Sequence, residues 1–187
     1  MDWDTAAFYA VNGLAGQSTA LDWLMRQCSS ATNFVVLVVA FLAWRAWLDW
    51  REGILITSVL GVLIGAGDFL GTQLKFWIAR PRPCQVLLNV HELTGCGKVF
   101  SLPSNHAVNA ATAAALLGVL FPKTRGIIMP LLLLGGISRV YLGAHYPTDV
   151  LAGWCLGGLL GTMVGYLVAK SSWQSPPEPP FPPLSGG

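Results

Sequence analysis

The sequence predicts an all-α integral membrane protein, a helical bundle of five transmembrane helices with amphipathic helices at the N-terminus. Apolar residues make up 53% of the 187-residue chain and charged residues only 11%, whereas an average soluble domain is about 25% charged. The charged residues also gather in short clusters that long uncharged stretches separate. This composition excludes a soluble globular protein, a disordered chain and a nucleic-acid-binding protein, and the net charge of +2 adds little.

Five stretches of the chain have the length and composition of a membrane-spanning helix. A hydrocarbon core about 30 Å thick needs roughly 20 mostly apolar residues in a helix. For example, 24 uncharged residues separate Lys98 from Lys123, and 20 separate Asp149 from Lys170. The core of a soluble protein explains one or two such runs, but not five in a chain of this length. The predicted spans cover residues 31–48, 53–74, 104–121, 126–144 and 149–169.

The start of the chain is expected to form two short amphipathic helices that lie in the membrane interface. Asp2, Asp4, Asp22 and Arg26 interrupt its apolar residues, so a sixth, poor span is only the alternative interpretation. No basic segment precedes an apolar one, and a cleavable signal peptide is therefore not expected. The apolar residues at helical spacing are Phe8, Tyr9, Val11 and Leu14, and then Leu21, Trp23, Leu24 and Met25.

The chain is expected to form one membrane domain over residues 1–170, followed by a proline-rich tail over residues 171–187. The tail holds six of the twelve prolines. Such a composition favours an extended, disordered polyproline segment without a core. We therefore expect no catalytic role for the tail.

The predicted spans place their connections at two ends of the bundle. One end collects residues 49–52, 122–125 and the start of the tail, and the other collects the 75–103 loop and the 145–149 turn. Three cations of the second end are candidates for chemistry, and without them five basic residues face three. The positive-inside rule then predicts that the second end faces outward, into the periplasm of a bacterial inner membrane.

The outward loop contains two cysteines, Cys84 and Cys96, twelve residues apart. In an oxidising compartment they can form a disulfide, and two free thiols are the alternative. The sequence alone leaves both open.

Three clusters of polar residues fall at the outward end, where ionisable groups next to a span are candidate functional groups. Lys75, Arg80 and Arg82 lie at the end of the second span, the two arginines beside prolines, and suggest an anion site, although snorkelling cations are the alternative. Residues 103–106 begin the third span, where the free N–H groups of a helix start bind anions. His106 lies in that first turn, and a plain helix cap is the alternative.

The third cluster combines Arg139, His145 and Asp149 around the turn into the last span. A carboxylate that binds one nitrogen of an imidazole fixes its tautomer and frees the other nitrogen as nucleophile or base. A metal pair is the weaker interpretation, because Glu92 is the only other obvious carboxylate nearby and a two-metal site needs more.

Together the clusters match the needs of a phosphoryl group. Three cations and a helix N-terminus suit its charged equatorial oxygens, and two histidines allow one nucleophile and one general acid. Two other classes remain open: a binding or transport protein that holds an anion or lipid phosphate without hydrolysis, and a metal-dependent hydrolase.

At these residues the sequence resembles the type 2 phosphatidic acid phosphatase (PAP2) superfamily of membrane lipid phosphatases, over residues 75–149. The family's three motifs are Lys-x6-Arg-Pro, Pro-Ser-Gly-His and Ser-Arg-x5-His-x3-Asp. They match Lys75, Arg82 and Pro83; then Pro103, Ser104 and His106, with Asn105 in place of Gly; and then Ser138, Arg139, His145 and Asp149.

The resemblance implies a role for each matched residue. His145 attacks phosphorus and forms a phosphohistidine, Asp149 holds His145, and His106 protonates the leaving oxygen and then activates water. No metal or cofactor is implied. The implied phosphate ligands are Lys75, Arg82, Ser104, the Asn105 backbone N–H and Arg139.

The expected activity is metal-independent hydrolysis of a lipid phosphate or diphosphate at the outer face of the membrane. Candidate substrates are undecaprenyl diphosphate, phosphatidylglycerophosphate, phosphatidic acid and lipid A phosphate, and the sequence does not choose among them. Membrane lipids are the other expected partners, and the oligomeric state is not predicted. Asn105 is expected to alter substrate preference more than chemistry, Arg80 to contact the head group, and Asp68 to have a structural role.

Overall fold

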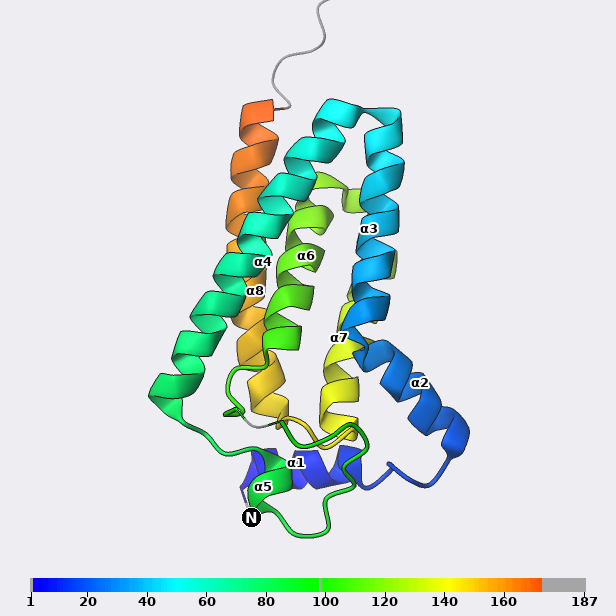
Figure 1. Ribbon diagram of the computed structural model, residues 1–187, viewed down its shortest axis with the longest axis vertical. Helices are drawn as coiled ribbons and strands as arrows, with labels where there is room; N and C mark the ends of the chain where they lie inside the picture. The colour runs from blue at the N-terminus through cyan, green and yellow to red at the C-terminus, as the bar shows by residue number, and fades with distance from the viewer. Residues whose placement is uncertain (1, 98, 173–187) are drawn as a thin grey trace, which may run out of the picture.

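The computed structural model describes residues 2–97 and 99–172, and this part of the chain is all-helical, without strands (Figure 1). The predicted fold class is therefore confirmed. The proline-rich stretch 173–187 lies outside the described residues. The helices are α1 (Trp3–Asn12), α2 (Thr19–Ser29), α3 (Ala31–Leu48), α4 (Trp50–Ile78), α5 (Pro83–Val86), α6 (Asn105–Leu120), α7 (Arg125–Tyr141) and α8 (Pro147–Ser172), with a 3-10 turn at Pro122–Thr124.

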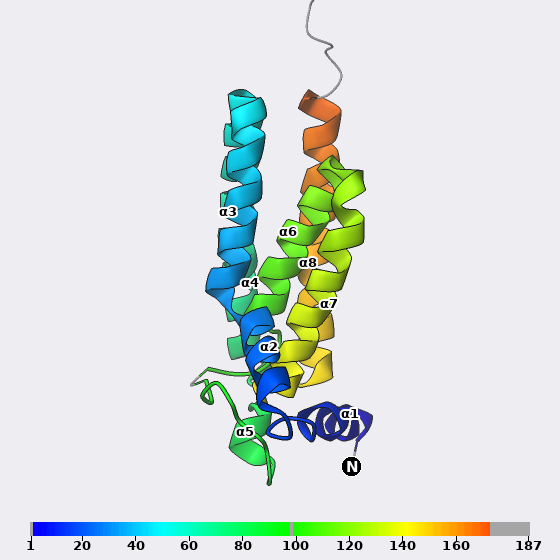
Figure 2. The ribbon, with the colours of Figure 1, turned by 90° about the vertical axis from the view of Figure 1, so that its right-hand side faces the viewer.

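Five long helices form the bundle in two layers. Figure 2 shows α3 and α4 on one side and α6, α7 and α8 on the other, and α4 packs on α6 between the layers. Within the described residues, three segments are long and apolar enough to cross a membrane: Ala31–Leu48, Trp50–Val86 and Pro147–Ser171. The other two predicted spans correspond to α6 and α7, which have 16 and 17 residues. The count of five membrane crossings therefore stays a prediction.

Four glycines let α8 approach α6 closely. Gly153, Gly157, Gly161 and Gly165 recur every fourth residue and lie on the face of α8 that contacts α6. A methyl group on Gly157 would overlap the backbone carbonyl of Val108. Small residues at this spacing let membrane helices pack backbone to backbone, which compensates for the absence of a hydrophobic driving force in lipid.

The connections lie at the two ends of the bundle as the sequence predicts. The α3–α4 turn, the α6–α7 turn and the end of α8 lie at one end in Figure 1. The loop from α4 to α6, the α7–α8 turn and the short helices α1, α2 and α5 lie at the other. Which end faces outward stays a prediction.

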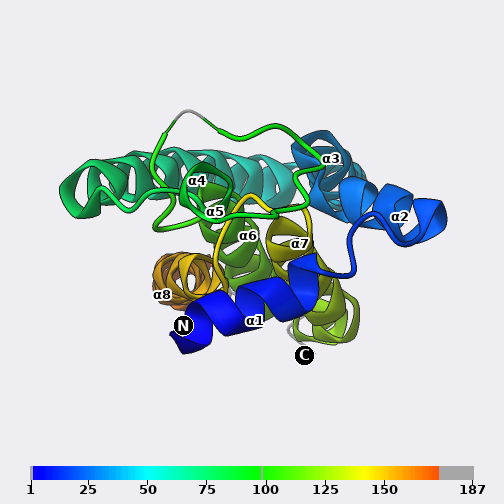
Figure 3. The ribbon, with the colours of Figure 1, turned by 90° about the horizontal axis from the view of Figure 1, so that it is seen from below.

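The two N-terminal helices that the sequence predicts are present, and the buried face of α1 packs on the bundle, while their position in the membrane interface stays a prediction. Figure 3 shows α1 lying across the ends of the bundle helices, and its buried face consists of Asp4, Phe8 and Asn12. Phe8 is fully buried against Tyr146 and not against lipid. The apolar pattern indicated one covered face, and protein covers it because Asp4 and Asn12 find polar partners there. With 10 and 11 residues, α1 and α2 are too short to provide a sixth span.

Candidate active site

The turn between α7 and α8 presents His145 at the end of the bundle that α1 covers. The chain reverses at Gly143, whose φ of +79° is a conformation that favours glycine. The backbone N–H groups of Ala144 and His145 both donate to the carbonyl of Arg139, which ties the turn to the end of α7. Pro147 then begins α8, at a position where its missing N–H costs nothing. The nucleophile candidate therefore sits on a turn that both helices fix.

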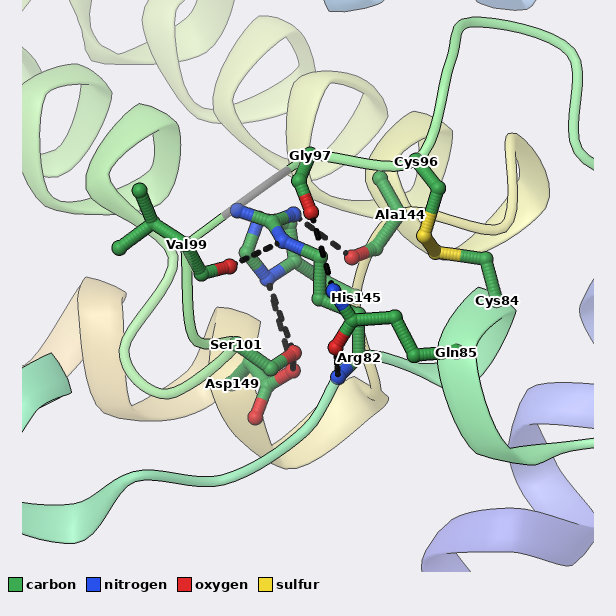
Figure 4. The surroundings of a disulfide bond; sticks show 10 residues. All are labelled: Arg82, Cys84, Gln85, Cys96, Gly97, Val99, Ser101, Ala144, His145 and Asp149. Carbon is green, nitrogen blue, oxygen red and sulfur yellow. Dashed lines mark hydrogen bonds and ion pairs between the residues drawn. A yellow bond between two sulfur atoms is a disulfide. The ribbon is translucent and has the colours of Figure 1, made fainter.

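Three side chains surround the imidazole of His145 (Figure 4). Its Nδ1 lies 3.4 Å from Asp149 Oδ2 and 3.4 Å from the hydroxyl of Ser101, which itself donates to that carboxylate oxygen. On the opposite side, Arg82 Nη1 lies 3.2 Å from His145 Nε2. Because a guanidinium only donates, Nε2 is the acceptor and the proton sits on Nδ1. This tautomer leaves the Nε2 lone pair for a nucleophilic role.

Burial keeps this imidazole neutral. His145 is only 2% exposed, and burial lowers its pKa from 6.5 to about 3. The nearby charges of Arg82 and Arg139 act in the same direction, whereas the hydrogen bond with Asp149 and its negative charge act in the opposite one. At neutral pH the ring therefore needs no deprotonation before it reacts.

A disulfide between Cys84 and Cys96 lies next to Arg82, so the pairing that the sequence left open is present (Figure 4). The bond joins α5 to the segment that precedes α6. Arg82 Nε donates to the carbonyl of Val99 at 2.7 Å, and Nη1 donates to the carbonyl of Ala144 at 3.0 Å. The guanidinium is thus held against His145 by the cross-linked loop on one side and the α7–α8 turn on the other.

Lys75 is buried at the same end, but its ammonium group contacts the backbone. Its Nζ donates to the carbonyls of Phe100 at 3.0 Å, Ser101 at 3.1 Å and Pro103. Three donors are all that an ammonium has. In this state Lys75 therefore shapes the loop before α6 and offers no further N–H group to a phosphate.

The N-terminus of α6 adjoins the first turn of α8. The Ser104 N–H donates to the carbonyl of Asp149 at 2.9 Å. The Ser104 hydroxyl is buried and has no hydrogen-bond partner among the described residues. A buried orphan hydroxyl at a helix start is available to an anion.

His106 and Arg139 open onto a cavity of about 320 Å³ between the two layers of the bundle. Arg139 Nη1 donates to the hydroxyl of Ser29, and its buried Nε has no partner among the described residues. The charges of Arg82 and Arg139 act on both imidazoles, so the two arginines lie near His106 as well as near His145. The apolar part of the cavity is lined by Phe34, Val35, Val38, Val39, Leu60, Ile64, Ala113 and Leu131.

The side chain of Asn105 points to α4. Its amide donates to Asp68 Oδ1 at 2.9 Å and to Thr72 Oγ1 at 3.2 Å, and Gly71 leaves room for it. We expected a structural role for Asp68, and its hydrogen-bond partner is Asn105, the residue that replaces the motif glycine. Asn105 and Asp68 both line the cavity beside His106.

Arg80, which we expected to contact the lipid head group, contacts protein side chains in this structure, and its contact with lipid stays a prediction. Its guanidinium donates to Asp149 Oδ1 at 2.9 Å, Thr148 Oγ1 at 2.6 Å and Asp4 Oδ2 at 2.6 Å. It also lies 3.8 Å from the centre of the Tyr146 ring. The polar partners of Arg80 therefore hold it against the first turn of α8.

Two residues of this site, Ser101 and Asp4, were missed from the sequence. Ser101 precedes the second motif by two residues, and that proximity was the only signal for it. Asp4 had a weaker signal, as one of several acidic residues in an apolar stretch. Among residues 2–97 and 99–172, no group of three or more His, Cys, Asp or Glu side chains is arranged to hold a metal ion.

The chain is similar to several known membrane phosphatases. The family model described as PAP2 superfamily matches residues 56–173. Undecaprenyl-diphosphatase BcrC of Bacillus subtilis is 30% identical over 161 residues, which cover 82% of this chain and 78% of that protein. Phosphatidylglycerophosphatase B of the same organism is 38% identical over 117 residues, covering 55% of this chain and 53% of the relative. Lipid A 1-phosphatase of Rhizobium etli is 28% identical, covering 68% and 55%.

Solved structures share the fold. The crystal structure of a transmembrane PAP2-type phosphatidylglycerolphosphate phosphatase from Bacillus subtilis superposes with a TM-score of 0.71 at 28% identity, and covers 94% of this chain and 90% of its own. Aquifex aeolicus LpxE superposes with a TM-score of 0.72 over 89% of this chain and 96% of its own. At 22% identity the second likeness concerns the fold alone.

Proposed function

Since the chain belongs to the PAP2 superfamily and is a phosphatase of that type, we propose that it hydrolyses a lipid phosphate or diphosphate through a phosphohistidine at His145. One observation carries this proposal. The neutral imidazole of His145 turns Nε2 to Arg82 and Nδ1 to Asp149. Attack on phosphorus requires an unprotonated Nε2 beside cations that hold the phosphate oxygens, and the bound phosphate takes over the Arg82 donor that Nε2 accepts in the free enzyme.

In the first step, Nε2 of His145 attacks phosphorus and the bond from phosphorus to the lipid oxygen breaks. His106 gives its proton to that oxygen, and the lipid leaves as an alcohol or, from a diphosphate, as a monophosphate. Arg82, Arg139 and the N–H groups at the start of α6 stabilise the three equatorial oxygens. The carboxylate of Asp149 stabilises the positive charge that develops on the ring.

In the second step, water attacks the phosphohistidine while His106 accepts its proton. The bond between phosphorus and Nε2 breaks, and inorganic phosphate leaves. Both imidazoles then regain their starting protonation states, so the cycle needs no other proton donor.

In the free enzyme, Lys75 supports the site by holding a loop and does not offer an N–H group to the phosphate. Its three donors hold the loop that leads to Ser104, and its charge stays near the phosphate site. Direct contact with substrate requires that one of these carbonyls gives way to a phosphate oxygen.

The cavity supports a lipid substrate. Its polar end holds His106 and Arg139, and its apolar wall runs along α3, α4 and α6 into the depth of the bundle. A volume of about 320 Å³ lies at the low end for ligand sites and accommodates one hydrocarbon chain next to the reacting phosphate. A polyprenyl diphosphate is the first substrate to test, because the relative BcrC covers most of the chain.

The test is phosphate release in detergent from polyprenyl diphosphate, phosphatidylglycerophosphate, phosphatidic acid and lipid A phosphate. We expect hydrolysis of at least one of these lipids that EDTA leaves intact, vanadate inhibits, and His145→Ala, His106→Ala or Asp149→Asn abolishes. Phosphate release by His145→Ala near that of the wild type would contradict the phosphohistidine, and binding of these lipids by the wild type without phosphate release would support a binding or transport protein. Loss of wild-type activity in EDTA would support a metal-dependent hydrolase.

A further inference from the structure

Helix α1 binds the turn that carries the candidate nucleophile, although it lies outside residues 56–173, which the family model matches. Asp4 Oδ1 accepts the backbone N–H of Thr148 at 3.0 Å, and its other oxygen accepts the Thr148 hydroxyl. Asn12 donates to the carbonyl of Tyr141 at 2.8 Å. The buried face of α1 thus contacts the chain on both sides of His145.

Arg80 connects Asp4 to Asp149. One guanidinium nitrogen donates to Asp4 and the other to Asp149 Oδ1, while Oδ2 of Asp149 faces His145. The carboxylates are 8% and 0% exposed. Two nearly buried carboxylates therefore share one cation, and only one of them touches the nucleophile.

Because Asp4 and Asp149 both bind Arg80, Asp4 determines how strongly Arg80 acts on Asp149. Without the charge of Asp4, Arg80 would have Asp149 as its only acidic partner among the described residues. The guanidinium would then bind Oδ1 of Asp149 more strongly, pull this carboxylate away from His145 and neutralise more of the carboxylate's charge. Less negative charge would remain to stabilise the ring of His145 as it bonds to phosphorus.

We propose that Asp4 is a positioning residue of the reaction, which acts through Arg80 and Thr148 to hold Asp149 against His145. This inference rests on the proposed function of His145 and Asp149. It makes α1 a part of the active site and gives one of the acidic residues of the N-terminal stretch a purpose that the three motifs do not include.

The test is Asp4→Asn, which removes the charge and keeps the shape and one acceptor, the oxygen that binds the backbone N–H of Thr148. Because misplacement of a catalytic group by about 1 Å can cost roughly 100-fold, we expect kcat to fall about 10- to 100-fold. KM should stay within about two-fold, since Asp4 does not touch the lipid. Rates are measured per folded enzyme, with folding checked by size exclusion and thermal unfolding in detergent. Asp49→Asn is the control, because asparagine also caps a helix and α4 begins at the opposite end.

A double-mutant cycle with Arg80→Gln tests the route of the effect. If Asp4 acts through Arg80, the two losses in kcat are not additive. Additive losses, a kcat within two-fold of wild type, or a rise in KM at constant kcat would each overturn the inference. If Asp4→Asn is fully active while His145→Ala is inactive, only this inference fails. If wild type releases no phosphate from any of the four lipids, or if His145→Ala stays active, the proposed function fails with it.

Discussion

His145 lies buried between a cation and a carboxylate, and these neighbours decide which of its nitrogens reacts. Arg82 is 3.2 Å from Nε2, whereas Asp149 and Ser101 lie on the Nδ1 side. The depressed pKa of His145 is the consequence of this burial, and it couples the nucleophile to the stability of the fold.

The coupling predicts how stability depends on pH. The pKa of His145 is about 3 when folded and has its ordinary value of 6.5 when unfolded, so between these values the unfolded chain binds more protons. The free energy of unfolding therefore falls as pH falls from 6.5 towards 3. His145→Gln removes this contribution, so the wild type should lose more Tm than the variant between pH 7 and pH 4.5. Parallel Tm curves in detergent would contradict the depressed pKa.

The sequence predicted those site residues that lie close together in the chain or belong to one of the three motifs. The spacing of His145 and Asp149 predicted their pairing, because four residues around a helix start bring two side chains together. Spacing could not reveal Asp4, which lies 144 residues from Thr148. Nor could it show that Lys75 holds loop carbonyls, because the path of a loop depends on the whole fold.

At the scale of elements, the packing of α8 on α6 depends on glycines. Gly157 lies against the backbone of α6, whereas a methyl group on Gly158 would meet nothing within 4 Å. Gly157→Ala should therefore lower the free energy of unfolding by about 1–3 kcal/mol through overpacking. Gly158→Ala, the matched control, should leave it unchanged or raise it by up to about 1 kcal/mol. Equal effects of the two variants on thermal unfolding would show that the helices do not approach along this face.

The contribution of the Cys84–Cys96 disulfide to stability and activity can also be measured. The bond joins residues twelve apart and should contribute roughly 3 kcal/mol to stability. It also holds the loop that positions Arg82, so the double variant Cys84→Ser and Cys96→Ser should lose phosphatase activity as well as Tm. Dithiothreitol should affect the wild type in the same way and leave the double variant unchanged. Full activity after complete reduction would contradict a role of the cross-link at the site.

The N-terminal helices show where an amphipathic pattern stops being informative. The pattern predicted one covered face of α1, but lipid and protein cover an apolar face equally well. Asp4 and Asn12 lie on the same face as Phe8, at four-residue spacing. Polar residues within an apolar face indicate protein partners, and this signal could have placed α1 on the bundle.

At the scale of the whole molecule, the described helices fit a membrane protein with its two ends in different compartments. Large apolar side chains face outward, among them Val62, 73% exposed, and Leu159, 68% exposed. Such surfaces suit lipid and would be a liability in water. The candidate site lies at one end, near the disulfide, and not in the middle of the bundle.

The distribution of charge predicts that this end faces outward. After reduction of intact cells or spheroplasts, a thiol probe that does not cross membranes should label Cys84 and Cys96. When Cys28, which lies in α2 at the same end of the bundle, is replaced by Ser in both proteins, the variant without Cys84 and Cys96 should stay unlabelled, since Cys155 falls within a predicted span. Labelling that requires inside-out vesicles would reverse the orientation and place phosphate release in the cytosol.

Trapping of the intermediate tests the central claim most directly. The wild-type enzyme is mixed with a lipid substrate that carries labelled phosphate, quenched within one turnover and digested for mass spectrometry. The account predicts phosphate on the peptide that contains His145, stable in alkali, labile in acid and absent from His145→Asn. Phosphate release without any protein-bound label, or with a label on another residue, would contradict it.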